Sequence, residues 1–222
     1  MSSFNDLPAE DLTLAAETSS MDDLAVRRPG QGVSEKAEEL RRAEPFRSAV
    51  RRVLGITAGD GTYRKGGKGE MLVAKRLVKL SAEWRVLHSI PVGDKGTDID
   101  HVVIGPGGVF SLNTKNHSGQ RVWVHTHAFK VNGSPHNDYL RASRAEARKA
   151  SRLLSAASGL AVEVIGVVVV VADCLDIKGM PLDTPVVARK KIVDWLRSQP
   201  ICLSSAQIES IYAAARQTTT WR

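Results

Sequence analysis

The 222-residue chain has few cysteines and no long apolar run. Its two cysteines, Cys174 and Cys202, form no metal-type pair, and a reducing cytoplasm is the simplest setting for them. The most apolar stretch, Val164 to Ala172, is too short to span a bilayer and predicts a buried strand. No basic segment followed by an apolar run opens the sequence, so we predict no signal peptide and a cytoplasmic protein without a membrane partner.

Lysine and arginine are missing from residues 1–24, which carry six acids. Removing those six negative charges from the formal net charge of +7 leaves +13 on the rest of the chain. A basic body favours a polyanionic partner such as nucleic acid. The same surplus also serves solubility alone, so charge by itself leaves both interpretations open.

Composition divides the chain into four predicted segments. Residues 1–33 are acidic and polar and end in a Pro/Gly stretch, which predicts a disordered arm. Residues 34–65 are rich in Arg and Glu and then in Gly, which predicts a basic helical extension followed by a mobile linker. An ordered domain is expected over residues 66–216, and residues 217–222 are expected to form a tail.

The ordered domain shows alternating helical and strand periodicities. Apolar residues at 73, 77 and 80 follow helical spacing, and a β-branched run over 162–171 predicts a central buried strand. The other patterns predict strands over 84–90, 98–105, 109–115, 121–126, 129–131 and 185–188, and helices over 135–157, 192–198 and 205–216. We therefore expect an α/β fold with a central mixed β-sheet flanked by helices.

One predicted hairpin gathers polar side chains. If its turn is centred between Pro106 and Gly107, Asp100 lies opposite Asn113, about 5 Å away at Cβ. Lys115 is two residues further along and shares that face, whereas His101 points to the other face and is expected to pack there. A slip of one residue in register would move Asp100 away from Asn113 and Lys115. The hairpin thus predicts a carboxylate, an amide and an ammonium at one place.

Glu70 lies on the apolar stripe of the first predicted helix, three residues before Val73 and seven before Leu77. A carboxylate on a core-facing stripe is unfavourable unless it meets a cation or hydrogen-bond donors. A glutamate in a first turn can also simply interact with the helix dipole. The hairpin acids favour the functional interpretation.

Several short motifs resemble the nuclease-related domain (NERD), a branch of the PD-(D/E)xK nuclease superfamily. They are Tyr63-Arg64-Lys65-Gly66-Gly67, Gly69-Glu70, Asp98-Ile99-Asp100-His101, Gly105-Pro106-Gly107-Gly108-Val109-Phe110 and Thr114-Lys115-Asn116. The resemblance implies a restriction-endonuclease-like core that hydrolyses DNA phosphodiester bonds with Mg²⁺ or Mn²⁺. It places Glu70, Asp100, Asn113 and Lys115 at the catalytic positions. Glu70, Asp100, Asn113 and the Thr114 carbonyl would hold the metal, because hard cations prefer oxygen ligands, and Lys115 would orient the attacking water.

Two positions depart from the family pattern. Asn113 stands where the superfamily usually has Asp or Glu, and Asp138 stands where related sequences often have Gln. An amide coordinates through its carbonyl but brings no charge, so weaker metal binding or lost turnover is expected. Two alternatives therefore stay open: a nucleic-acid-binding module that has lost turnover, and an interaction or scaffold protein whose arm recruits a partner.

A basic stripe runs along the long helix predicted over 135–157. Its members recur at three- and four-residue steps and are Arg141, Arg144, Arg148 and Arg152. In a nuclease such a stripe would hold DNA phosphates without reading bases, although a solvated helix face gives the same pattern. No P-loop, dinucleotide-binding glycine pattern or Gly-x-Ser-x-Gly turn occurs, which argues against those enzyme classes.

Overall fold

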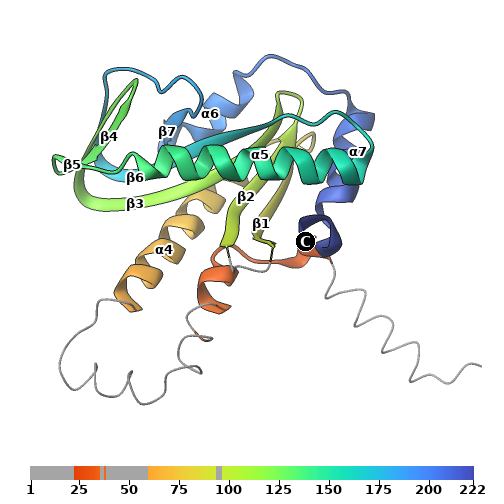
Figure 1. The fold of residues 1–222 in the computed structure, drawn as a ribbon, viewed down its shortest axis with the longest axis horizontal. Coiled ribbons are helices and arrows are strands. Elements are labelled where there is room, and N and C mark those ends of the chain that lie inside the picture. The colour runs from red at the N-terminus through yellow and green to blue at the C-terminus, as the bar shows by residue number, and fades with distance from the viewer. Residues whose placement is uncertain (1–22, 36–37, 39–59, 94–96) are drawn as a thin grey trace, which may run out of the picture.

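The computed structural model describes residues 23–35, 38, 60–93 and 97–222, whose strands form one seven-stranded mixed sheet (Figure 1). Strands β1 to β5 follow one another as antiparallel neighbours, while β6 runs parallel to β3 and β7 runs parallel to β6. The strands are β1 (Arg85–Val92), β2 (Thr97–Gly105), β3 (Gly108–His125), β4 (Ala128–Val131), β5 (Ser134–Pro135), β6 (Val164–Ile177) and β7 (Val186–Ala188). The expected mixed sheet is confirmed.

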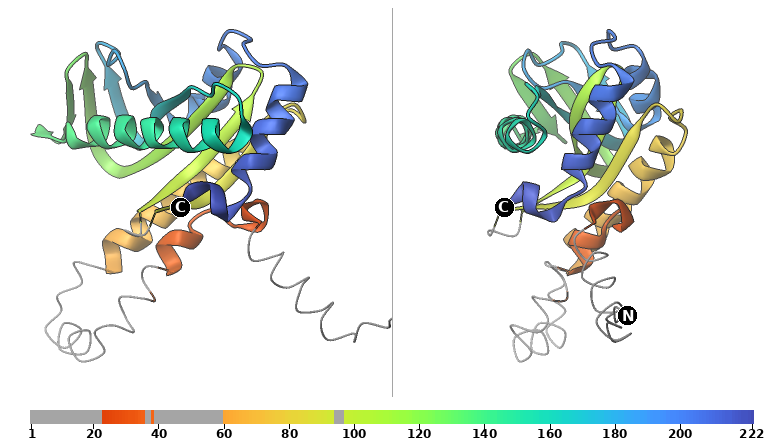
Figure 2. Two further views of the ribbon diagram at one scale, coloured as in Figure 1. Left: turned by 45° about the vertical axis from the view of Figure 1, so that its right-hand side comes forward. Right: turned by 90° about the vertical axis from the view of Figure 1, so that its right-hand side faces the viewer.

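Helices cover both faces of this sheet. They are α4 (Asp60–Leu77), α5 (Asp138–Ser158), α6 (Ile192–Arg197) and α7 (Ser205–Ala215), with 3-10 turns η1 (Leu24–Val26), η2 (Arg189–Lys191) and η3 (Thr218–Trp221). Figure 2 shows α4 and α5 on opposite sides of the sheet. The expected α/β class with flanking helices is therefore confirmed.

Alternation along β2 explains the two cores. Val102 and Ile104 pack with α5 and α7, while Val103, between them, packs with α4 and α6 on the other face. Residues 167–170 of β6 are buried throughout, as expected for a central strand with neighbours on both sides. No helix within the described ranges has the length and apolarity needed to cross a membrane.

The predicted disordered arm is wrong for residues 23–33, while residues 1–22 lie outside the described residues. Asp23 pairs with Arg216, and Leu24 is buried against the end of the chain, where Trp221 is fully buried as well. Trp221, within the expected tail over 217–222, is likewise part of the core. We call Asp23, Leu24, Arg216 and Trp221 the terminal clasp. Its contacts join the two ends of the described fold, so the local composition of either end could not reveal them.

The boundary predicted at residue 66 is also wrong. Helix α4 already begins at Asp60 and runs through glycines that we expected in a mobile linker. Close packing gives the reason for Gly69, since a Cβ there would lie 2.8 Å from the Cβ of Asn116 on β3. The greater part of the predicted extension over 34–65 lies outside the described residues.

Strand β3 is longer than predicted. The two segments expected over 109–115 and 121–126 form a single strand of 18 residues, with a register shift against β6 between His117 and Arg121. Gly119 has a positive φ of 79° at this irregularity. The first half of β3 pairs with β2 and the second half with β4, so this strand links two parts of the sheet.

Candidate active site

The β2–β3 hairpin has the predicted register. Gly105 pairs with Gly108, and the pairing continues to His101 opposite Leu112, so the next position places Asp100 opposite Asn113. The Thr114 backbone N–H donates a hydrogen bond of 2.5 Å to Oδ2 of Asp100. Asp100 is therefore tied to the strand that carries Asn113 and Lys115.

His101 lies on the other face, as predicted. It is fully buried, and its Nδ1 lies 2.8 Å from Nδ1 of His88 on β1. Burial is the main reason that the pKa of His101 lies well below its usual range, and the neighbouring His88 lowers it further. A neutral buried imidazole pair is a packing feature, so His101 belongs to the core.

Asp100 and Glu70 meet from two different elements. Glu70, on α4, is only 6% exposed. Burial raises its pKa, and the nearby carboxylates of Asp100 and Asp98 raise it further, whereas the Gly30 N–H and Lys115 lower it. Burial also raises the pKa of Asp100, against the opposing effects of the Thr114 N–H and Lys115. Two carboxyls thus share one poorly solvated place.

Lys115 is the cation of this cluster. Its charge lowers the pKa of Glu70, Asp100 and a third acid, Glu146, so it lies near all three. The ammonium sits 4.8 Å from the ring centroid of Tyr139, which supports it from one side. The cluster therefore has one ammonium group for three carboxyl groups.

Asn113 contacts Glu146, which sequence reasoning missed. Its Nδ2 donates to Oε2 of Glu146 at 3.3 Å. Burial, with Asp100 as the next cause, raises the pKa of Glu146 to about 8. Glu146 shares the inward face of α5 with Ser143 and Ala150, the same signal that had singled out Glu70 on α4. The helical spacing of Glu146 with Ser143 and Ala150 could therefore have predicted an inward-facing acid on α5.

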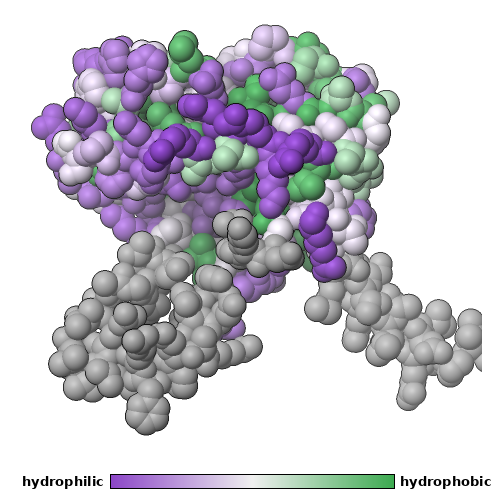
Figure 3. Space-filling view, viewed as in Figure 1, coloured by the Kyte–Doolittle hydropathy of each residue, from purple (hydrophilic) through white to green (hydrophobic). Residues whose placement is uncertain are grey.

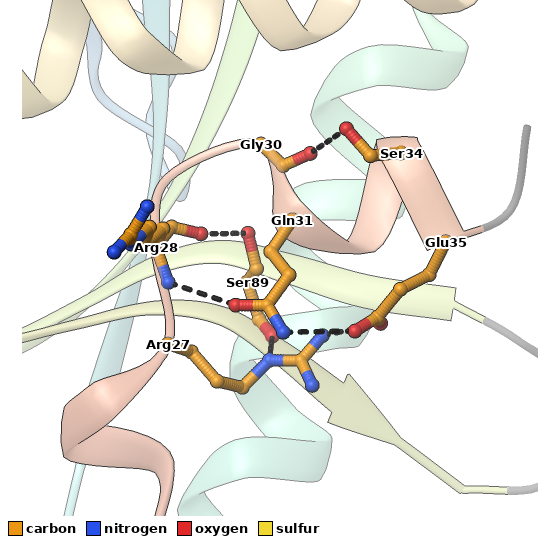
Figure 4. A network of polar contacts seen from close by, with 7 residues as sticks. All are labelled: Arg27, Arg28, Gly30, Gln31, Ser34, Glu35 and Ser89. Atoms are coloured by element: carbon orange, nitrogen blue, oxygen red, sulfur yellow. Dashed lines mark hydrogen bonds and ion pairs between the residues drawn. The ribbon is translucent and has the colours of Figure 1, made fainter.

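The N-terminal segment covers one side of the cluster. Arg27 Nε donates to the carbonyl of Ser89 on β1 at 2.7 Å, and Ser89 Oγ donates back to the carbonyl of Arg28 at 3.1 Å (Figure 4). These bonds hold the segment so that the Gly30 N–H reaches Glu70. A Cβ on Gly32 would lie 1.6 Å from Oδ2 of Asp98, so the segment passes directly beside that carboxylate. This segment lies within the predicted disordered arm, and sequence reasoning missed it too.

The arginine stripe does not join the acids. Arg141, Arg148 and Arg152 are exposed, and all three lie more than a quarter turn away from Glu146 around α5. Arg144 is half-buried and lies 3.7 Å from Asp183. Figure 3 shows hydrophilic side chains gathered along this front of the molecule. The stripe is thus a solvent-facing surface beside the cluster.

The oxygen atoms of this cluster are of the type that a hard divalent cation prefers as ligands. Glu70, Asp100, Glu146 and Asn113 offer carboxylate and amide oxygens, and Oε1 of Glu146 is buried without a hydrogen-bond partner among the described residues. The Thr114 N–H donates to Asp100, which places the backbone of Thr114 beside that carboxylate. In the described part of the chain, no three His, Cys, Asp or Glu side chains are already assembled closely enough to hold an ion. The cluster therefore fits the cation by chemistry and charge.

The mixed sheet flanked by helices is consistent with a nuclease-like core. The sequence model of the nuclease-related domain matches residues 65–171, which include Glu70, the hairpin and α5. Residues 65–171 therefore match the nuclease-related domain, as the motifs had indicated.

A second comparison gives a relative without a described function. The chain is 44% identical over 66 residues to an uncharacterized protein of Bacillus anthracis. The matched segment covers 28% of this chain and 29% of that protein, so the chain spans less than a third of its relative. No solved structure matches the chain.

Proposed function

We propose that this protein hydrolyses DNA phosphodiester bonds in a reaction that depends on Mg²⁺ or Mn²⁺. One observation carries the proposal: within the segment that matches the nuclease-related domain, the carboxyls of Glu70, which is buried, and Asp100, which is half-buried, lie near each other and near Lys115. A poorly solvated cluster with more carboxyls than ammonium groups favours binding of a cation, because the cation stabilises the ionised carboxylates. In this proposal Glu70, Asp100, Asn113 and Lys115 form the catalytic set.

The cation would be held by oxygen ligands from three elements. Glu70 comes from α4, Asp100 from β2, and the Asn113 amide and the Thr114 carbonyl from β3. When bound, the cation would supply positive charge to the scissile phosphate and lower the pKa of a bound water. The protein would hold these ligand oxygens in position, and the hydrogen bond from the Thr114 N–H does so for Asp100.

Lys115 would act on the water and on the developing charge. Its ammonium lies over the Tyr139 ring, which limits where it can point, and its charge acts on Glu70, Asp100 and Glu146. From that place it would orient the attacking water and offset charge on the phosphate in the transition state. Removal of Lys115 should therefore lower turnover more than metal binding.

DNA would be bound through its backbone. Arg141, Arg148 and Arg152 are exposed on α5 and present positive charge without the groups needed to read bases. The expected affinity falls steeply with salt and varies little with sequence. Both cysteines are free and exposed, which suits a reducing compartment, and we place the activity in the cytoplasm.

A second candidate function rests on Asn113. Because this position carries an amide in place of the usual acid, the second candidate is a nucleic-acid-binding module without turnover. DNA binding without cleavage under every metal condition would favour that candidate. Absence of DNA binding even at low salt would favour an interaction or scaffold role.

Purified full-length protein incubated with supercoiled and linear DNA provides the test. We expect nicking or degradation with Mg²⁺ or Mn²⁺ and none with EDTA. Lys115→Ala serves as the inactive variant, since it removes the ammonium and leaves all proposed ligands. Cleavage that persists in EDTA or in Lys115→Ala would point to a contaminating nuclease and would leave the proposed site without support.

A further inference from the structure

Glu146 is a carboxylate on the inward face of α5. Its neighbours on that face, Ser143, Ala147 and Ala150, are buried, and α5 packs there against β3 and β6. A carboxylate in such a position is unfavourable unless its oxygens are satisfied. The way each oxygen is satisfied therefore indicates what the side chain does.

The two oxygens of Glu146 have different surroundings. Oε2 accepts a hydrogen bond of 3.3 Å from the Asn113 amide. Oε1 has no exposed surface and no hydrogen-bond partner within the described residues. A glutamate with a purely structural role would be expected to engage both oxygens, because nearly all buried polar atoms in folded proteins are bonded.

Glu146 lies beside the proposed metal ligands, since it contacts Asn113 directly. Asp100 raises its pKa and Lys115 lowers it, so both charges act on it at short range. Asn113, its hydrogen-bond donor, stands where the family usually has an acid. The carboxylate absent from β3 is therefore matched by a carboxylate that reaches the same place from α5.

We propose that Glu146 supplies the carboxylate ligand that position 113 lacks, and that the Asn113 amide holds Glu146 in place by donating to Oε2. Oε1 is then the oxygen directed to the cation. This inference rests on the proposed metal-dependent function, and it changes the role of Asn113 from a direct ligand to a positioning residue. The charge of the ligand set is thereby restored to that of a site with an acid on the strand.

Binding of Mn²⁺ to the full chain, followed by electron paramagnetic resonance or calorimetry without DNA, tests the proposal. We expect Glu146→Gln to weaken Mn²⁺ binding at least about tenfold, because it keeps the shape and removes the charge. Glu163→Gln, an exposed glutamate before β6, is the matched control and should bind Mn²⁺ like the wild type. Melting of the metal-free proteins verifies folding, and Glu146→Gln should melt no lower than the wild type.

A charge swap sharpens the test. Asn113→Asp combined with Glu146→Gln returns the acid to the strand and should restore Mn²⁺ affinity to within a few-fold of the wild type. A structural role for Glu146 predicts no such rescue. The proposal is overturned if Glu146→Gln binds Mn²⁺ as the wild type does, or if the swap binds no better than Glu146→Gln alone.

Failure of this inference can be told apart from failure of the proposed function. Wild-type protein that binds Mn²⁺ and cleaves DNA, with unchanged binding in Glu146→Gln, refutes the role of Glu146 alone. Wild-type protein that binds no Mn²⁺ refutes both the proposed metal dependence and the role of Glu146.

Discussion

Two groups of acids in this molecule have opposite surroundings. In the terminal clasp, the Asp23 carboxylate accepts from Ala25 N and from the Arg216 guanidinium, and the hydrogen bond from Arg216 lowers its pKa. In the acid cluster, Glu70, Asp100 and Glu146 share one lysine, and burial raises the pKa of each. The Asp23 carboxylate has its cation, whereas the cluster has three carboxyls for one ammonium, and the ionised forms of these acids are disfavoured until a cation binds.

This difference separates stability from function. A paired carboxylate such as Asp23 contributes to the free energy of folding, while buried acids with raised pKa are destabilising in the absence of a cation. Substitutions in the clasp should therefore lower stability without changing the chemistry. Substitutions in the cluster should change the chemistry while leaving stability intact or improving it.

The largest effect is expected for Lys115→Ala on cleavage. Loss of the ammonium that would stabilise transition-state charge should reduce the cleavage rate on the order of 100-fold or more. Lys178→Ala, an exposed lysine after β6, should cleave at the wild-type rate. Rates are compared on supercoiled DNA with Mn²⁺, and wild-type cleavage by Lys115→Ala would remove Lys115 from the proposed catalytic set.

The next largest effect is expected for Leu24→Ala on stability. Leu24 is 1% exposed, and deleting a buried leucine side chain costs about 2–5 kcal/mol of unfolding free energy. Val26→Ala, at a side chain that is 63% exposed, should cost far less. Urea unfolding measures both. A small loss for Leu24→Ala would mean that the clasp is not part of the folding core.

The sequence was sufficient to predict the hairpin that carries Lys115, but it was not sufficient to predict the burial of Leu24. The glycines of the Gly105–Gly108 turn fix the hairpin register, so the placement of Asp100 across from Asn113 followed from local pattern alone. The burial of Leu24 and Trp221 depends on contacts between the two ends of the described chain, and such contacts leave no local periodicity. Expectations drawn from composition therefore placed both residues outside the domain.

Only those parts of the site that leave a local sequence pattern could be predicted. Glu70 shares a face with Val73 and Leu77, and Glu146 shares a face with Ala150, so both inward acids left a helical signal. The continuous course of β3 left none, because it depends on its pairing with β6 on one side and with β2 and β4 on the other. The contact from Asn113 to Glu146 arises only once α5 lies across that strand.

Glu70→Gln is expected to have a smaller effect on stability than Leu24→Ala, and in the opposite direction. Removing a buried carboxyl whose ionised form is disfavoured should raise the stability of the metal-free protein at neutral pH by about 1 kcal/mol. The melting temperature in EDTA would rise by a few degrees. A melting temperature clearly below that of the wild type would show that Glu70 is a structural acid like Asp23.

The smallest effect is expected for Asp23→Asn, and it depends on pH. The folded-state pKa of Asp23 lies below its ordinary value of 3.8, so its contribution is present above that value and is lost as pH falls through the folded pKa. At neutral pH we expect a loss of about 1 kcal/mol or less, because Arg216 is partly exposed. The difference from the wild type should shrink below about pH 4 in urea unfolding curves. A difference that is constant down to pH 3 would contradict the ion pair.

The most direct test of the metal site is the melting temperature of the wild type and of Asp100→Asn, measured with EDTA and with increasing Mn²⁺. Binding to the folded state alone stabilises by about 2.7 kcal/mol when Mn²⁺ reaches one hundred times its dissociation constant. We predict that wild-type melting rises progressively with Mn²⁺ and that Asp100→Asn, folded in EDTA, shows little or no rise. Equal rises in the two proteins, or no rise in the wild type, would contradict a divalent-cation site at the acid cluster.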